Sequence, residues 1–309
     1  MSRKPEHIKT ISQYHNVRGL RKPLHPLISI VDYSQVSISN EDKHKSWIYD
    51  FYLIAVKRSS DPAFKMKYGQ NKYDYDEGIM FFMSPEQILS IEGNENRSFQ
   101  KSGWMLLIHP DFLFGTPLVK TIKSYEYFKY STHEALFLSE KEEQALSGII
   151  TNIKQEHQSV IDKHSQHIIV SQIDTLLAYS NRFYERQFIT RKPMNHHVLE
   201  KFEEIINEYF RNENFIEDGM LSVTDIASQL NLTPNYLSSV LKHLTGQSTQ
   251  YYIHHKLIEI AKEKLSVTDL SVSQIAYQLG FDYPQSFSKL FKIKTGVTPS
   301  IFRQSYNRH

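Results

Sequence analysis

The sequence contains the same pattern twice near its C-terminus. The segment LSVTDIASQL at 221–230 recurs 49 positions later as LSVSQIAYQL at 270–279. The segment PNYLSSVLKHLTG at 234–246 recurs 50 positions later as PQSFSKLFKIKTG at 284–296, with the extra residue in the intervening turn. An internal repeat of this kind means that one supersecondary unit is built twice.

Each copy predicts two short helices joined by a tight turn. In the first copy, the apolar residues at helical spacing predict a first helix that ends before 231–233. Thr233 is then the predicted N-cap of the second helix, and Pro234 its first residue. The second helix ends at a glycine, which is Gly246 in the first copy and Gly296 in the second. This pattern is typical of the helix-turn-helix, and the two units are predicted at about 223–245 and 272–295.

The outward face of the second helix in each copy is polar. A helix-turn-helix inserts this helix into the major groove of DNA, where hydrogen-bonding and cationic side chains contact bases and phosphates. Solvated faces of a four-helix bundle are the alternative, and finding the same acid-free face twice disfavours it. The predicted DNA-contacting residues are Asn235, Tyr236, Ser238, Ser239, Lys242 and His243 in the first copy, and Gln285, Ser286, Lys289 and Lys292 in the second.

The charge of the C-terminal region also favours DNA. The whole chain has 36 Lys+Arg against 34 Asp+Glu, a net charge of +2. From Asn231 to His309 there are nine basic and four acidic residues, and nine minus four gives a local charge of +5. A local surplus of this sign is expected of a surface that faces phosphates.

A long helix at 249–265, the linker helix, joins the two predicted helix-turn-helix units, and TGVTPSIFR follows at 295–303. The most specific residues are Phe291-Lys292, Thr295-Gly296, Pro299 and Phe302-Arg303. With these features the C-terminal region resembles the DNA-binding domain of AraC/XylS-type transcriptional regulators. The resemblance covers the last third of the chain. It implies double-stranded DNA as a partner, RNA polymerase as a further candidate partner, and a homodimer.

Two departures from the family pattern concern base reading. Ser238 and Ser239 stand where many relatives place larger side chains that read bases, and the linker helix carries His254-His255-Lys256 in place of an arginine cluster. Serine has a shorter reach than lysine or glutamine. The first unit is therefore predicted to discriminate bases less than the second.

The N-terminal part of the chain is predicted to consist of an arm followed by β-strands. Residues 1–26 are polar and are predicted to form a loosely held arm. From 27 to 110, six short segments rich in β-branched and aromatic residues alternate with turn residues, which predicts an antiparallel barrel or jelly roll. The family resemblance implies a cupin-like sensing barrel at 27–138. The predicted fold class is α+β multidomain, with this N-terminal barrel and a C-terminal all-α, homeodomain-like double helix-turn-helix domain.

A barrel of this size can hold a small ligand. The aromatic residues predicted to contact such an effector are Tyr49, Tyr52, Tyr68, Tyr75 and Trp104, with plain core packing as the alternative. A catalytic cupin would need three or four converging metal ligands, whereas His44 and His109 are the histidines between 27 and 110. No metal, cofactor or enzymatic activity is therefore predicted.

Helices are predicted after the barrel. Ser139 and Glu142 form a capping box that opens a helical connector at 139–188, which either caps the barrel or, as the resemblance implies, forms a homodimer contact. Residues 189–197 show no periodicity and are predicted to be a linker. The DNA-binding domain at 198–309 then opens with a helix at about 198–211, whose outer side is acidic.

The composition places the chain in a broad class. It contains no cysteine and has neither an apolar run of about 18 residues nor a basic-then-apolar N-terminus, which predicts a cytoplasmic protein outside the membrane. The predicted function is a DNA-binding transcriptional activator or repressor, modulated by a small ligand or by dimerisation through the N-terminal domain. A cupin-type enzyme with a helical accessory domain and a helical adaptor are the alternatives.

Overall fold

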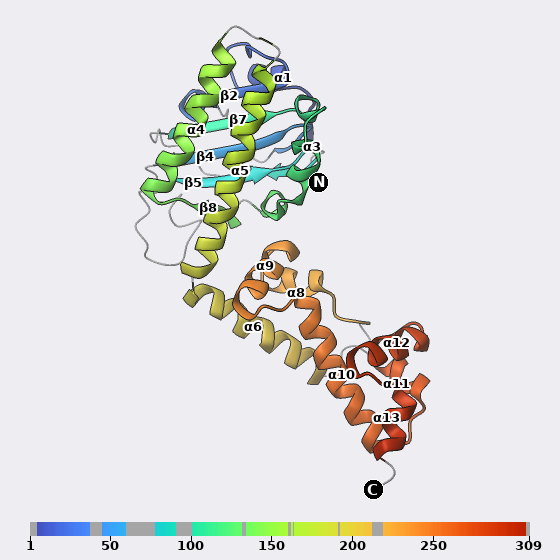
Figure 1. Cartoon of the computed structure of the whole chain (residues 1–309). Coiled ribbons are helices and arrows are strands. Elements are labelled where there is room, and N and C mark those ends of the chain that lie inside the picture. The colour runs from blue at the N-terminus through green and yellow to red at the C-terminus, as the bar shows by residue number, and fades with distance from the viewer. Residues whose placement is uncertain are drawn as a thin grey trace. The chain divides into compact units, whose positions relative to one another are not determined.

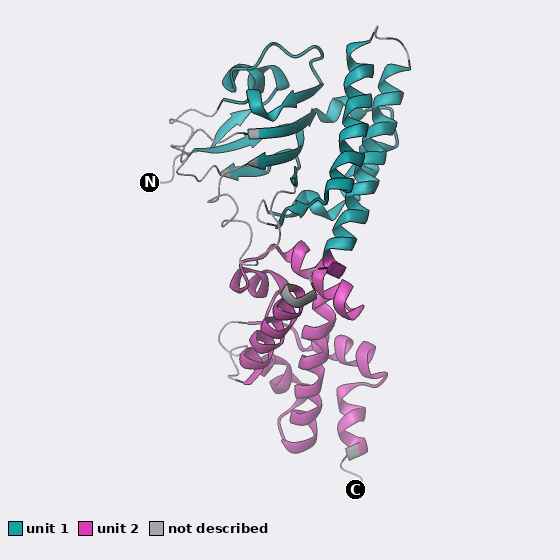
Figure 2. Ribbon diagram, turned by 90° about the vertical axis from the view of Figure 1, so that its left-hand side faces the viewer, with its two compact units in different colours: residues 1–187 teal, residues 188–309 magenta. Residues whose placement is uncertain are grey.

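The computed structural model describes residues 5–37, 45–59, 78–90, 101–131, 134–159, 162, 164–190, 192–211 and 219–306. The chain forms two compact units, Met1–Gln187 (unit 1) and Phe188–His309 (unit 2), which Figure 2 distinguishes by colour. Among the described residues, no helix combines the length and the apolar character needed to span a membrane.

Unit 1 contains two β-sheets. The larger sheet is antiparallel, has the strand order β2-β7-β4-β5-β8, and consists of β2 (Ile28–Asp32), β4 (Tyr52–Ser59), β5 (Ile79–Met83), β7 (Lys101–Ile108) and β8 (Leu136–Phe137). In the smaller sheet, β3 (Ser46–Tyr49) pairs in parallel with β1 (Glu6–Ile8) and antiparallel with β6 (Ile88–Ser90). Strands are thus confirmed where the structure describes the span from 27 to 110, and residues 60–77 and 91–100 lie outside the described part. The described strands form two separate sheets and no closed barrel, so the cupin barrel is not confirmed.

Both faces of the larger sheet are buried. Alternate side chains such as Leu53 and Leu107 pack into one core with Trp47 of the smaller sheet and with α1 (Ile11–Val17). The opposite face packs against α4 (Glu140–Gln158) and α5 (Ser165–Thr190), which lie across the strands in Figure 1. The hydroxyl of Ser180 on α5 lies 3.9 Å from the sulfur of Met80 on β5.

Short helical segments connect these layers. They are η1 (Tyr33–Gln35), η3 (Pro110–Leu113), α3 (Leu118–Thr121), η4 (Ile122–Ser124) and η5 (Glu126–Lys129). The hydroxyl of Tyr127 in η5 donates a 2.9 Å hydrogen bond to the carbonyl of Leu177, which fixes this segment against α5. At the start of α4, the amide of Ser139 donates to the carboxylate of Glu142 at 2.9 Å, as the predicted capping box requires.

Unit 2 is entirely helical in its described part, which confirms the all-helical C-terminal domain. Its helices are α6 (Lys192–Arg211), α8 (Val223–Gln229), α9 (Pro234–Thr245), α10 (Thr249–Val267), α11 (Val272–Gln278), α12 (Pro284–Thr295) and α13 (Pro299–Tyr306), following the last residues of α5. A single core contains Phe202 of α6, Leu257 of α10 and residues from both helix-turn-helix units. The linker helix α10 therefore packs against both units.

The entry helix begins earlier than the sequence pattern predicted. We expected a helix from Val198 after a linker at 189–197, but α6 already begins at Lys192. Pro193 lies in its first turn, where the missing N–H of proline costs no helical hydrogen bond. Within the segment predicted as linker, the Asn195 side-chain amide donates a 2.7 Å hydrogen bond to the carbonyl of Phe188.

Candidate nucleic-acid interface

The first helices of the two helix-turn-helix units start with the same cap. In α8, the Ser222 hydroxyl accepts from the amide of Asp225 at 3.2 Å, and the Asp225 carboxylate accepts from the amide of Ser222 at 3.0 Å. In α11, Ser271 and Gln274 exchange the equivalent hydrogen bonds at 3.2 and 2.8 Å. These capping boxes define where each unit begins.

The turns of the two units share a left-handed residue. It is Asn231 in the first unit, with a φ of 54°, and Gly280 in the second, with a φ of 80°. Asparagine and glycine tolerate this conformation better than other residues. In both turns the next amide donates back into the preceding helix, to the carbonyl of Ala227 at 2.9 Å or of Ala276 at 3.0 Å. The chain then reverses into the second helix of the unit.

The recognition helices α9 and α12 bury equivalent positions. Leu237 and Leu241 of α9, like Phe287 and Phe291 of α12, are fully buried in the common core. Each pair is four residues apart, so that one face of each helix is anchored. The residues predicted to contact DNA lie on the remaining faces of the two helices.

The remaining face of α12 is polar and open to solvent. Gln285, Ser286, Lys289 and Lys292 are all exposed. Gln285 and Lys289 are one turn apart and point the same way. A glutamine amide matches the edge of adenine, and a lysine matches guanine or a phosphate. The structure therefore presents all four residues predicted for the second unit on an accessible surface.

The equivalent face of α9 is less accessible. Lys242 and His243 are exposed, whereas Asn235 and Ser239 are half-buried. The hydroxyls of Ser238 and Thr249 lie 3.3 Å apart, so that Ser238 faces the linker helix α10. The residues predicted for the first unit thus do not form one continuous open surface.

Tyr236 is the clearest departure within the predicted set. Its side chain is 6% exposed, and its ring centroid lies 5.6 Å from that of Phe188. Periodicity placed Tyr236 on the outer edge of α9, but a segment outside the repeat covers that edge. Tyr236 is therefore a packing residue in this structure.

Two exposed tyrosines in the second unit were not among the predicted residues. Tyr283 directly precedes α12 and is 68% exposed, and Tyr277 is exposed on α11. In the repeat register they correspond to Thr233 and Ser228 of the first unit. A comparison of the two copies position by position would have singled them out, because both changes place an aromatic ring where the first copy has a small polar residue.

The start of the linker helix lies close to the end of α12. Burial, helped by the nearby charge of Lys294, disfavours the protonated form of His254 and lowers its pKa. The ammonium of Lys294 lies 5.0 Å from the centre of the Tyr251 ring, a cation–π contact between the end of α12 and the start of α10.

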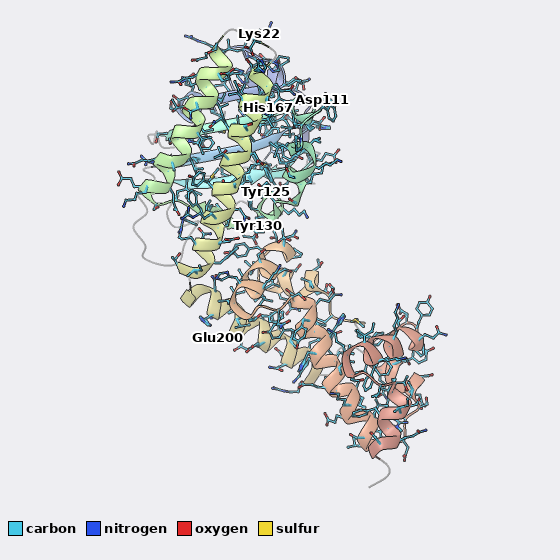
Figure 3. The ribbon with its side chains drawn as sticks, viewed as in Figure 1. Lys22, Asp111, Tyr125, Tyr130, His167 and Glu200 are labelled. Carbon is cyan, nitrogen blue, oxygen red and sulfur yellow. The ribbon has the colours of Figure 1, made fainter. Side chains whose placement is uncertain are left out.

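On the outer side of α6, exposed Glu200, labelled in Figure 3, is followed by exposed Glu203 and Glu204.

Of the five aromatic residues predicted to bind a small ligand, the structure describes three, and these do not line one pocket. Tyr49 lies in the core between the two sheets, where its ring stacks on that of Phe51 at 5.3 Å. Tyr52 belongs to the opposite face of the larger sheet and contacts Phe128 of η5 at 5.3 Å. Trp104 is buried as well, and Tyr68 and Tyr75 lie outside the described residues.

The described residues contain no group of three or more histidine, cysteine, aspartate or glutamate side chains that could hold a metal ion. His109 pairs with Asp111 at 3.4 Å. His44 lies outside the part of the chain that the structure describes.

Comparison with known proteins places the same region in a family. A family model described as a helix-turn-helix domain matches residues 226–305. The transcriptional activator AarP of Providencia stuartii is 38% identical over 85 residues, which cover 28% of this chain and 63% of AarP. The regulatory protein PocR of Salmonella typhimurium is 33% identical over 89 residues, which cover 29% of this chain and 29% of PocR.

Among solved structures, the C-terminal domain of the response regulator yesN from Fusobacterium nucleatum is 30% identical, covers 33% of this chain and 96% of that chain, and has a TM-score of 0.28. The chain spans less than two thirds of the length of either curated regulator. The family match falls on the helices of the duplicated helix-turn-helix. Residues 226–305 are therefore an AraC-type helix-turn-helix domain, and through it the C-terminal region of this chain belongs to the AraC/XylS family of transcriptional regulators.

Proposed function

We propose that the whole chain is a sequence-specific transcriptional regulator that binds double-stranded DNA with α9 and α12 in successive major grooves. Such grooves lie about 34 Å apart along one face of the duplex. The observation that carries the proposal is the open polar face of α12, with Gln285, Ser286, Lys289 and Lys292 exposed opposite the buried Phe287 and Phe291. The linker helix α10, which packs against both units, sets their spacing.

The two units divide the work of recognition unequally. Gln285 and Lys289 read base edges from α12, because both are exposed and long enough to reach the groove floor. Asn235 and Ser239 of α9 are half-buried and shorter, which supports a smaller contribution to base discrimination. Lys242 and Lys292 lie later in their helices and hold phosphate.

Unit 1 modulates this binding, in our proposal, through a small ligand or through dimerisation. The family of the C-terminal region consists of regulators, which supports a regulatory and not a catalytic role for the chain. The amphipathic helices α4 and α5 are the proposed homodimer contact.

Salt dependence tests the DNA-binding proposal. We expect residues 188–309 to fold alone and to bind duplex DNA, because this unit has its own core and includes Phe188. If six or more phosphates are contacted, affinity should fall by a factor on the order of 10³ between about 50 and 200 mM salt. Fluorescence anisotropy with a labelled duplex measures this. A flat response would contradict the phosphate contacts.

The matched control uses a lysine on the acidic side of the domain. Lys201 is exposed on α6 among Glu200, Glu203 and Glu204. Lys201→Ala should leave the salt slope unchanged, whereas Lys242→Ala should lower it by about one unit.

Base preference separates the reading residues from the anchoring residues. Lys289→Ala or Gln285→Ala should relax base preference in one half of the binding site and cost about 1 to 3 kcal/mol of binding free energy there. Lys242→Ala should weaken binding to all sequences about equally, because it removes a phosphate contact. Selection from a randomised duplex library with each variant measures both effects. The opposite result would be that Lys289→Ala selects the wild-type motif while Lys242→Ala selects a different one. It would mean that Lys242 reads bases and Lys289 does not.

A further inference from the structure

The last turn of α5 packs against the first recognition helix. Phe188 is buried in unit 2, and its ring centroid lies 5.6 Å from that of Tyr236 and 6.0 Å from that of His243, both on α9. The buried Asn195 side chain donates its 2.7 Å hydrogen bond to the carbonyl of Phe188 and so fixes the backbone at this point. One side chain from outside the repeat thus contacts two residues of the DNA-facing helix.

The internal repeat shows that this contact is particular to the first unit. With the 50-residue offset, Tyr236 corresponds to Ser286 and His243 to Ile293. Ser286 is exposed, and Ile293 is 68% exposed. The same edge is therefore open on α12 and covered at Tyr236 on α9. The helix-turn-helix fold does not require the cover, because the second unit forms without it.

The covered edge runs directly beside a predicted reading residue. Tyr236, Ser239 and His243 follow one another at spacings of three and four, so they form one row along α9. Phe188 contacts the residues on both sides of Ser239 in this row. We expect this contact, together with the buried Leu237 and Leu241, to restrict the rotation of α9 about its axis, and with it the direction in which Ser239 and Asn235 point. A binding site loses discrimination when its side chains turn by about 10 to 20°.

We propose that Phe188 is a positioning residue for the first recognition helix, which it holds in the orientation that reads DNA. This inference rests on the proposed function. The same helix, α5, supplies Ile173 and Leu176 to the buried part of unit 1. Phe188 thus lies on the same helix as residues of the unit 1 core.

The test compares full-length Phe188→Ala and Phe188→Leu with the wild-type chain. The first probe is a duplex that the wild-type chain selects from a randomised library. In the second probe, the sequence is scrambled in the half of the site whose base preference does not change in Lys289→Ala. Phe188→Ala should bind the intact duplex about three- to tenfold more weakly and the scrambled duplex as the wild type does. Phe188→Leu, which fills most of the space, should recover most of the affinity. The control is Ile189→Ala, since Ile189 is the exposed neighbour of Phe188.

A second measurement reports on the contact itself. The Phe188 ring should shift the proton resonances of the His243 imidazole, and this ring-current shift should disappear in Phe188→Ala. Equal weakening on both duplexes would overturn the proposal, because it indicates general destabilisation. The proposal would also be overturned if Phe188→Ala lost the His243 shift but bound the intact duplex as the wild type does. Tighter binding of Phe188→Ala would overturn it too, because Phe188 would then hinder DNA binding. A wild-type chain that selects no sequence would instead refute the proposed function.

Discussion

Replacing Phe291 by alanine is expected to lower the free energy of unfolding of residues 188–309 by about 3 to 5 kcal/mol. The Phe291 side chain is fully buried on the inner face of α12. Its ring lies 5.8 Å from that of Phe287 and 5.5 Å from that of Phe302, so its removal leaves a cavity between α12 and α13. Urea unfolding followed by circular dichroism measures the loss.

The same helix offers a matched control two residues away. Ile293 is 68% exposed, and Ile293→Ala should change the free energy of unfolding by no more than about 0.5 kcal/mol. If the two variants unfold at the same urea concentration, the inner and outer faces of α12 are wrongly assigned.

Gly103→Ala is expected to destabilise unit 1 by about 2 to 6 kcal/mol, since backbone strain and steric overlap each cost about 1 to 3 kcal/mol. Gly103 lies in β7, an interior strand of the larger sheet between β2 and β4, and is paired with Lys57 of β4. Its φ is 121°, a backbone conformation that residues other than glycine rarely adopt. An added Cβ would overlap the carbonyl oxygen of Val56. Relief would require β4 and β7 to separate.

Tryptophan fluorescence can follow this unfolding without interference from unit 2. Trp47 and Trp104 are the only two tryptophans of the chain, and both are buried in unit 1. Gly148→Ala provides the control, because Gly148 is exposed within α4 and its added Cβ would meet no atom within 4 Å. That substitution should raise the free energy of unfolding by about 0.5 to 1 kcal/mol. A Gly103→Ala protein as stable as wild type would show that the β4–β7 pairing is incorrect.

The repeat made most of unit 2 predictable from sequence. Caps and turn residues such as Pro234, Gly246 and Gly296 mark helix ends through local backbone chemistry, which a sequence displays directly. The buried and exposed faces of α12 follow from helical periodicity in the same way. Tyr236 shows where such reasoning ends. Periodicity assigns a residue to a face, but it cannot show that Phe188, 48 positions earlier, covers that face.

Tyr49 and Tyr52, two of the residues predicted to contact a ligand, lie on opposite sides of the larger sheet for a related reason. Alternation separates the two faces of a strand, but it identifies an inner face only when the other face is exposed to solvent. The larger sheet of unit 1 is covered on both faces. The sequence pattern therefore predicts that both Tyr49 and Tyr52 face inward, although they pack into cores on opposite sides of that sheet.

The duplicated backbone also bears on how a binding specificity can evolve. Buried positions repeat as apolar pairs, such as Leu241 and Phe291, whereas outward positions have diverged, as in Ser239 and Lys289. Natural selection can therefore change the outer residues of one unit while both units keep their interior. Under the proposed function, the sequence preference of each half of a DNA site can therefore change independently, and a new target can arise by single substitutions that leave the protein folded.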